Sequence, residues 1–361
     1  MSTPTLALVG LSQTERSMLF EQITALDPDA VAPLERARFG GAPGWLVSDA
    51  ALARTVLTNG IGVKSRPAAS QFKLGGVGAR QGREVRSLKR ELLLALGSLA
   101  EQEDLVHKHV AAALGAREGV LPTGLTEALT SATISLVTGT APGSVDQTGL
   151  RNQVMQTWTL IEDANATGSR HDAFYIYLRG LLSASGSTFL SSLEARGWRR
   201  EQIAEELRAM ILAGWGSTAA AITSAISLGV AADLRGAFVL DEVLRLYPPS
   251  FMIGRTVAES RRGLPFERGE ILLISPWLIH RSSRGWRAPL DFDPERWKDR
   301  RPGTPRWFLP FGLGPRRCPA ARFARTQAQV TGSLLCTVRR PDRTEVVLLE
   351  NRSPALVPAA R

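Results

Sequence analysis

A glycine-rich stretch that ends in a cysteine, Phe311-Gly-Leu-Gly-Pro-Arg-Arg-Cys318, constrains the possible folds of this chain more than any other feature. Gly312 and Gly314 carry no side chain, so the backbone there can lie close against a flat ligand. Arg316 offers a forked donor that suits a carboxylate. The stretch therefore predicts a loop that lies against a flat, acidic ligand.

The residues after Cys318 indicate that this cysteine is a thiolate. Pro319 suits the first position of a helix, and Ala320–Val330 follows with a helical pattern. A cysteine just before a helix N-terminus meets the positive end of the helix dipole and unpaired backbone N–H groups, which favour thiolate over thiol. A thiolate, two glycines and a carboxylate-binding arginine together fit a haem ligand.

The loop resembles the haem-binding loop of the cytochrome P450 family, Phe-x-x-Gly-x-Arg/His-x-Cys-x-Gly. Phe311, Gly314, Arg316 and Cys318 match this pattern, and Ala320 replaces the last glycine. The resemblance implies haem b with the Cys318 thiolate as axial ligand. The residues that would lie around this cofactor are Phe311, Gly312, Gly314, Arg316 and Ala320. The alternative is a buried free cysteine beside a glycine turn.

A second motif lies upstream, where Glu242 and Arg245 stand three residues apart and share a helix face. Taken alone, they could form an ordinary surface pair. Their apolar neighbours and the following Pro-Pro resemble the Glu-x-x-Arg helix of the family, and Arg296 in Asp293-Pro-Glu-Arg-Trp297 matches its third member. The resemblance implies a buried network that holds the cysteine loop in register.

A third motif lies in a helix that the pattern predicts over Glu201–Ala232. Its middle, Ala213-Gly-Trp-Gly-Ser-Thr-Ala219, holds two glycines, and each costs about 1 kcal/mol in a helix relative to alanine. The stretch resembles the oxygen-binding motif of the family, Ala-Gly-x-Asp/Glu-Thr. Ala213 and Gly214 are kept, Gly216 replaces the acid, and Ser217 replaces the threonine, with Thr218 beside it. The proton-donating carboxylate of the motif is therefore missing.

The resemblance also implies further contacts to the haem propionates. In the helix predicted over Glu84–Leu96, Lys89 matches the basic position, and Arg86 and Arg90 are alternatives. An ordinary solvated helix face explains these three residues equally well. Arg255, in a predicted strand, matches a second propionate ligand.

Four residues fall where relatives line the substrate pocket: Phe251, Met252, Ile253 and Trp215. His280 lies in a run that resembles a structural turn and helix of the family, and we expect it to be structural.

The composition limits the classes of function. Apolar residues make up 44% and charged residues 22%, as in a soluble protein with a substantial core. The chain has two cysteines, which do not make a disulfide framework, and this favours a reducing, cytoplasmic compartment. We expect Cys336 to be a core residue. We expect no signal sequence, and no apolar run long enough for a membrane span.

The net charge of +10 raises the alternative of nucleic-acid binding. The arginines are spread along the chain, however, without zinc-ligand spacing or aromatic–basic interleaving, so a solvated basic surface is favoured. Basic residues around the cysteine loop could also dock an acidic electron-transfer partner.

The sequence thus predicts one mainly α-helical domain with small β-sheets (α+β) over residues 1–361, with the cytochrome P450 fold. The resemblance implies a monooxygenase that oxidises a small organic substrate with dioxygen and electrons from a ferredoxin-type partner, as a tailoring step in specialised metabolism. Because the acid is missing at Gly216, the alternatives are peroxide-driven oxidation, rearrangement, dehydration, coupling or nitrogen-centred chemistry. A non-catalytic haem sensor is the alternative from another class.

Overall fold

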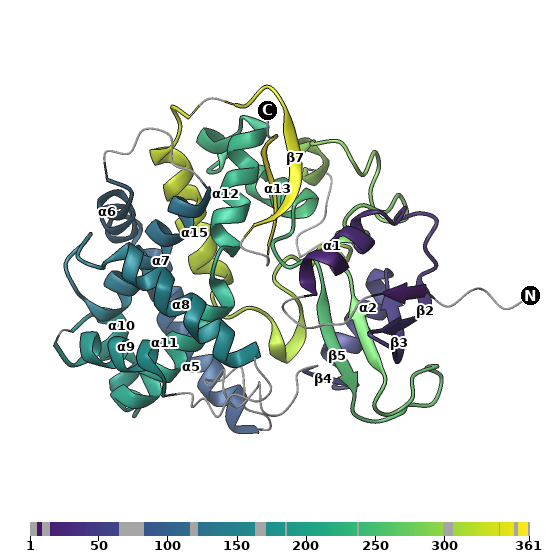
Figure 1. The fold of residues 1–361 in the computed structure, drawn as a ribbon, viewed down its shortest axis with the longest axis horizontal. Coiled ribbons are helices and arrows are strands. Elements are labelled where there is room, and N and C mark those ends of the chain that lie inside the picture. Colours follow the sequence, from purple (N-terminus) through teal and green to yellow (C-terminus); the bar gives the residue numbers. More distant parts are fainter. Residues whose placement is uncertain are drawn as a thin grey trace, which may run out of the picture. The chain divides into compact units, whose positions relative to one another are not determined.

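The computed structural model describes residues 6–8, 15–64, 83–115, 122–162, 171–184, 186–236, 238–298, 306–338, 340–349 and 353–359. The chain divides into two compact units, each described by itself. The sheet unit comprises Met1–Ser65, Thr223–Cys318 and Arg340–Arg361, and the helical unit comprises Arg66–Ile222 and Pro319–Arg339. Helices dominate and the sheets are small (Figure 1), so the predicted fold class is confirmed. The single domain over residues 1–361 stays a prediction.

The sheet unit is built on a six-stranded sheet of order β1-β2-β3-β6-β5-β4. Two strand pairs, β1–β2 and β3–β6, are parallel, and the other three pairs are antiparallel. The strands are β1 Leu6–Leu8, β2 Leu34–Phe39, β3 Ala42–Val47, β4 Gly62–Lys64, β5 Ile253–Val257 and β6 Ile271–Ile274. A separate antiparallel pair is formed by β7 Thr344–Leu349 and β8 Ser353–Pro358.

The turn between β2 and β3 shows how local sequence sets the register of the sheet. Phe39 pairs with Ala42, which leaves Gly40 and Gly41 as a two-residue turn. Both glycines have positive φ, 56° and 87°. Such turns match the twist of the flanking strands and need residues that tolerate φ above zero.

The sheet has a core on each face because alternate residues of a strand point to opposite sides. Leu46 and Leu273 belong to one buried cluster, and their neighbours Val47 and Ile274 belong to the other. The first cluster includes residues of α1 Arg16–Thr24 and α14 Pro276–Ile279, and the second includes residues of α2 Ala50–Thr58.

The remaining helices of the sheet unit are short. They are η1 Ala231–Asp233, α13 Val239–Leu246, η2 Pro294–Trp297 and η3 Gly314–Arg316. Helix α13 carries the Glu-x-x-Arg motif, and η2 carries Arg296.

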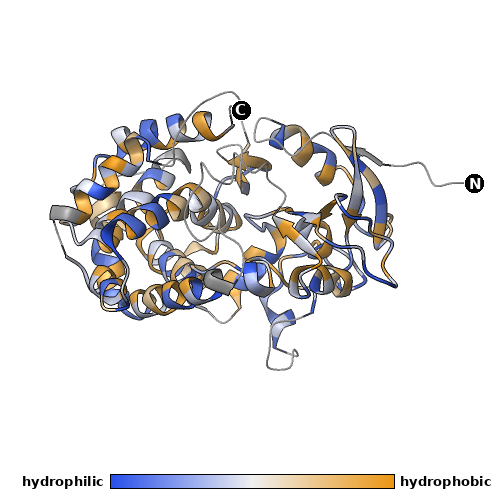
Figure 2. Ribbon diagram, turned by 90° about the horizontal axis from the view of Figure 1, so that it is seen from below, coloured by the Kyte–Doolittle hydropathy of each residue, from blue (hydrophilic) through white to orange (hydrophobic). Residues whose placement is uncertain are grey.

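The helical unit packs amphipathic helices against one another, and Figure 2 shows apolar and polar stretches alternating along them. Its helices are α5 Arg83–Glu101, α6 Glu103–Leu114, α7 Pro122–Thr138, α8 Gln147–Glu162, α9 Ala173–Ala184, α10 Thr188–Glu194, α11 Arg200–Gly214 and α15 Ala321–Leu334. Helix α15 contacts both α5 and α6. A buried ion pair joins α11 to the residue before α9, with Arg208 Nη2 at 2.5 Å from Asp172 Oδ2.

The predicted continuous helix over Glu201–Ala232 was wrong. Helix α11 ends at Gly214 and α12 Ser217–Leu228 starts anew, because Gly216 has a φ of +79° that an α-helix cannot contain. The 3₁₀ turn η1 then follows separately.

Two further expectations about apolar stretches need correction. Among the described residues, the stretch Arg200–Leu228, which contains α11, the break at Gly216 and α12, is long and apolar enough to cross a membrane by length and composition. In its 18-residue apolar window, 67% is buried inside the fold, as in a core helix. Cys336 is exposed rather than part of the core, because α15 ends at Leu334 and the cysteine lies in the following turn.

Candidate active site

The cysteine loop closes on itself through its backbone. The N–H of Cys318 donates to the carbonyl of Phe311 at 2.8 Å, and the N–H of Gly312 donates to the carbonyl of Leu309 at 3.0 Å. Between them, η3 makes a tight turn in which the N–H of Arg317 donates to the carbonyl of Gly314 at 3.1 Å. The position of Cys318 is therefore tied to the segment that precedes the loop.

The two glycines of the loop have different roles. Gly314 has a φ of +68°, and a Cβ there would lie 2.1 Å from the carbonyl oxygen of Leu57, so the loop packs tightly on the end of α2. Gly312 has a φ of +66°, and a Cβ there would meet only Ile253 Cδ1, at 3.7 Å. Gly312 therefore leaves the space beside it open.

Cys318 itself is partly exposed. A partly exposed thiol at the end of a rigid turn differs from the buried core cysteine of the alternative interpretation. Pro319 does not hold the first helical position that we predicted. Helix α15 starts at Ala321 with Ala320 as its N-cap residue, so Cys318 lies two residues before the cap.

Two arginines of the sheet unit form a cluster of positive charge. Arg255 is 9% exposed, and Arg316 is half-buried. Burial, together with the positive charge of Arg316, lowers the pKa of Arg255 to about 10. Burial also lowers the pKa of Arg316. Two desolvated cations that repel each other favour an anion between them.

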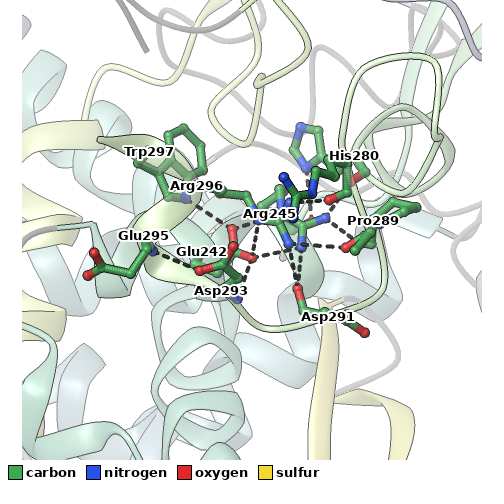
Figure 3. Close-up of polar contacts among 11 residues, drawn as sticks. Glu242, Arg245, His280, Pro289, Asp291, Asp293, Glu295, Arg296 and Trp297 are labelled. Atoms are coloured by element: carbon green, nitrogen blue, oxygen red, sulfur yellow. Dashed lines mark hydrogen bonds and ion pairs between the residues drawn. The ribbon is translucent and has the colours of Figure 1, made fainter. Parts of the chain in front are cut away.

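A buried network surrounds the carboxylate of Glu242 (Figure 3). Its oxygens accept hydrogen bonds from Arg245 at 2.8 Å, from Arg296 Nε at 2.9 Å and from Trp297 Nε1 at 3.0 Å, and from the N–H of Asp293. The side chains of Glu242 and Arg245 are both 0% exposed. They do not form the surface pair of the alternative interpretation.

Arg245 uses all five of its N–H donors. Three go to backbone carbonyls, those of His280 at 2.8 Å, Pro289 at 2.5 Å and Asp291 at 3.0 Å (Figure 3). The other two go to Glu242. A guanidinium with every donor satisfied fixes the chain segments that supply the acceptors.

The three predicted pocket residues before and in β5 differ in their surroundings. Phe251 is 1% exposed, and its ring packs on that of Phe20 with centroids 5.1 Å apart. This places Phe251 in the core rather than on a pocket wall. Met252 and Ile253 are partly buried.

In the helical unit, the small residues of the third motif are open to solvent. Ala213 and Gly214 are exposed at the end of α11, a helix that is mostly buried. A Cβ at Gly214 would meet no atom within 4 Å. These two positions therefore provide a flat backbone surface.

The residues that follow turn away from helical geometry. Trp215 is 1% exposed, and its indole nitrogen is buried without a hydrogen-bond partner. The hydroxyl of Ser217 donates to the carbonyl of Gly214 at 3.0 Å, and Ser217 and Thr218 are both partly buried. The hydroxyl proton of Ser217 is therefore already used in a hydrogen bond to the backbone.

The three basic residues predicted for a propionate differ in burial. Lys89 is 9% exposed, whereas Arg86 and Arg90 are exposed on α5. Burial distinguishes Lys89 from an ordinary solvated lysine, and the role of these residues stays a prediction.

Sequence reasoning missed the part that His280 plays around the loop. Its ring lies within hydrogen-bond distance of the N–H of Leu309, at 2.9 Å, and of the carbonyl of Arg245, at 3.2 Å. The only signal was a histidine within a strongly apolar run.

Comparison with known proteins gives two kinds of match. A family model described as "Cytochrome P450" matches residues 237–336, which include Glu242, Arg296 and Cys318. LUTEIN DEFICIENT 5 of Arabidopsis thaliana, a chloroplastic protein, is 38% identical over 104 residues, covering 27% of this chain and 18% of that protein. Cyclooctatin synthase of Streptomyces melanosporofaciens is 37% identical over 94 residues, covering 25% of this chain and 20% of that protein. The matches therefore span less than a quarter of either relative.

Solved structures match nearly the whole chain. Retinoic acid-bound cyanobacterial CYP120A1 has a TM-score of 0.73 at 18% identity, with 98% of this chain and 99% of that chain covered. A 6-coordinated cytochrome P450 from Thermus thermophilus has a TM-score of 0.68 at 20% identity, with 97% and 99% covered. The chain therefore has the same fold as these cytochrome P450 structures. Residues 237–336 match the cytochrome P450 family model, and the fold of the whole chain is that of the solved cytochrome P450 structures.

The residues present fit the haem of this family. Cys318 offers a partly exposed thiol, and Gly312 leaves open space beside it. Arg255 and Arg316 form a cationic pair suited to carboxylates.

Proposed function

We propose that this protein is a haem-thiolate monooxygenase that oxidises a small organic substrate with dioxygen. It takes electrons from a ferredoxin-type partner, works in the cytoplasm and performs a tailoring step in specialised metabolism. The proximity of Arg255, in β5, and Arg316, in the cysteine loop, carries this proposal. Two desolvated cations that repel each other suit a dianionic partner, and a haem carries two propionates.

The residues of the candidate site each have a defined task in this proposal. Cys318 holds the iron, and its backbone bond to Phe311 fixes the direction of the sulfur. Arg255 and Arg316 bind propionates. Haem bound through a thiolate supplies the oxygen chemistry, because the thiolate favours O–O cleavage. Met252 and Ile253 line the substrate side.

Proton supply is limited to hydroxyl groups in this proposal. Ser217 and Thr218 take the place of the acid and alcohol of the family motif. Because the Ser217 hydroxyl donates to Gly214 at 3.0 Å, it can still accept a hydrogen bond and orient a water. A protein with this arrangement receives protons through ordered water rather than from a carboxylate.

Turnover with defined components tests the proposal. Purified protein is loaded with haem and incubated with a panel of small apolar substrates, a ferredoxin with its reductase, and dioxygen. An oxygenated product that depends on every component supports it. If substrates shift the haem spectrum but no product forms, either with the reductant or with peroxide, the protein is instead the non-catalytic haem sensor.

A second candidate function, oxidation driven by peroxide, is favoured by one specific observation. Position 216 is a glycine in left-handed backbone conformation, so no carboxylate stands where oxygen activation draws its proton. Peroxide already carries the two electrons and two protons that the ferredoxin route must deliver. Product formation with peroxide at a rate above that with ferredoxin and dioxygen would select this candidate.

A further inference from the structure

The inference concerns His280, a residue in neither the cysteine loop nor the Glu242 network as the sequence motifs define them. His280 is 0% exposed and follows α14 as its C-cap residue. Its ring stands between two segments of the sheet unit that are far apart in the chain. One segment is α13, which carries Arg245, and the other is the segment that precedes the cysteine loop.

The two ring nitrogens have different partners. Nε2 accepts the N–H of Leu309 at 2.9 Å, so Nε2 carries the lone pair. The proton therefore lies on Nδ1, which donates to the carbonyl of Arg245 at 3.2 Å. The geometry assigns a single neutral tautomer. Burial and the charges of Arg245 and Arg281 lower the pKa of His280 to about 3, in agreement with a neutral ring.

Arg245 and His280 are connected in both directions. Arg245 Nη1 donates to the carbonyl of His280 at 2.8 Å, so each residue binds the backbone of the other (Figure 3). His280 also packs on Phe308, with ring centroids 5.5 Å apart, and Trp297 packs on the same phenyl ring at 4.7 Å. The segment at Phe308 and Leu309 is therefore held by two residues that are both bonded to the Glu242–Arg245 pair.

The backbone of Leu309 connects His280 to the cysteine loop. Its N–H is bound by His280, and its carbonyl accepts the N–H of Gly312 at 3.0 Å. Phe311, in the same turn, accepts the N–H of Cys318 at 2.8 Å. A continuous series of hydrogen bonds thus runs from Arg245 through His280 to the backbone that orients the sulfur.

We propose that His280 is a positioning residue that sets the direction of the Cys318 sulfur through the N–H of Leu309. The proposal rests on the proposed function in that Cys318 is the haem ligand. Without the ring, the buried N–H of Leu309 has no acceptor, and the loop gains freedom to relax. The expected result is a thiolate that is less well held and more easily protonated or displaced.

Two substitutions separate the two halves of the connection. Glutamine places its side-chain oxygen near the position of Nε2 and can accept from Leu309, whereas asparagine reaches only the position of Nδ1. We expect His280→Asn to raise the ratio of the thiol-type to the thiolate-type carbon monoxide complex about tenfold at equal haem content, the size of one buried hydrogen bond. His280→Gln is expected to stay close to the wild type.

His109 supplies a matched control in the helical unit. It is also buried, at 6% exposed, and its Nδ1 lies 2.7 Å from the Ser135 hydroxyl. His109→Asn therefore removes a buried imidazole of similar kind and is expected to lower stability without changing the carbon monoxide spectrum. If the spectrum of His109→Asn changes as much as that of His280→Asn, the change is due to general destabilisation, and the proposal is overturned.

The outcomes distinguish this proposal from the proposed function. A wild-type protein without a thiolate-type complex refutes the proposed function. A wild-type thiolate complex that His280→Asn retains in full overturns the positioning role alone, as does an equal loss in the Asn and Gln variants. If the variants do not fold, nitrogen-15 NMR of the diamagnetic wild-type ferrous carbon monoxide complex decides. An imidazole at position 280 protonated on Nε2, or titrating between pH 5 and 8, contradicts the proposal.

Discussion

Arg245 donates two parallel hydrogen bonds to Glu242, from Nε to Oε2 and from Nη2 to Oε1, both 2.8 Å long. Neither side chain is exposed. The carboxylate also accepts from Arg296, Trp297 and the backbone of Asp293. A buried pair with its partners satisfied ties helix α13 to the segment that contains η2. The same arginine binds His280, and through it the cysteine loop.

Removing the charge of Glu242 should therefore be costly. Glu242→Gln is expected to lower the free energy of unfolding by about 3–5 kcal/mol, because two buried guanidinium groups lose their counter-charge. Denaturant unfolding of the haem-loaded protein measures this loss. Glu201→Gln is the control, since its pair with Arg179 is half-exposed and should contribute nothing measurable. Equal stability of the two variants would contradict a network that holds the fold.

Replacement of Arg255 should change two properties in opposite directions. In the haem-free protein, Arg255→Met removes a buried cation that Arg316 repels, so the free energy of unfolding should rise by about 1 kcal/mol. Haem affinity should fall at least tenfold, because a propionate loses a charged donor.

Thermal unfolding of the haem-free form and haem titration measure the two effects. Arg255→Lys keeps the charge and loses the fork, so its haem affinity should lie between those of the wild type and Arg255→Met. A loss of stability in the haem-free form would show that Arg255 already has its counter-charge within the protein.

Position 216 permits a test of the missing acid with a built-in control. Gly216 has a φ of +79°, so Gly216→Asp and Gly216→Asn both carry backbone strain of about 1 kcal/mol. The two variants differ only in charge. If dioxygen is the natural oxidant, the Asp variant should convert a larger fraction of consumed electrons into product than the Asn variant. Equal fractions in the two variants would favour the peroxide route.

The pH dependence of stability should report the buried histidines. The pKa of His280 is about 3 in the folded protein, below its ordinary value of 6.5, and burial also lowers the pKa of His109. As the pH falls below about 6.5, the unfolded chain binds protons that the folded protein does not. Stability should therefore fall with decreasing pH, by up to about 1.4 kcal/mol per pH unit for each such histidine.

The range from pH 5 to 6.5 isolates this effect. The carboxylates with lowered pKa, Asp29, Glu201 and Glu270, lose their contribution only at lower pH. Denaturant midpoints at pH 5, 6 and 7.5 should show a smaller slope in His280→Gln than in the wild type. An unchanged slope would mean that His280 is protonated or accessible in the folded state.

The sequence predicted those parts of the site whose geometry follows from short spacing. Glu242 and Arg245 lie three apart on a helix, and the loop from Phe311 to Cys318 closes within a few residues. Arg296 could be assigned to the Glu242 network only because its segment, Asp293–Trp297, resembles a motif of the family. The Glu-x-x-Arg motif, the Arg296 segment and the cysteine loop all lie within residues 237–336, which match the family model.

Contacts set by tertiary packing could not be predicted in the same way. His280 meets residues that lie 29 and 35 positions away, and nothing in the local pattern specifies them. Cys336 lies in an apolar run that is typical of a core, yet the helix ends before it. The break at Gly216 had a signal in its two glycines, but apolar periodicity continues across it and favours one long helix.

The central claim is that Cys318 is the anionic axial ligand of a haem. The optical spectrum of the reduced carbon monoxide complex tests it most directly, in the wild type, in Cys318→Ser and in the control Cys336→Ser, whose cysteine is exposed. We predict the long-wavelength band of a thiolate complex in the wild type and in Cys336→Ser, and its loss in Cys318→Ser. A wild-type protein that binds no haem, or a Cys318→Ser spectrum identical to that of the wild type, would contradict the account.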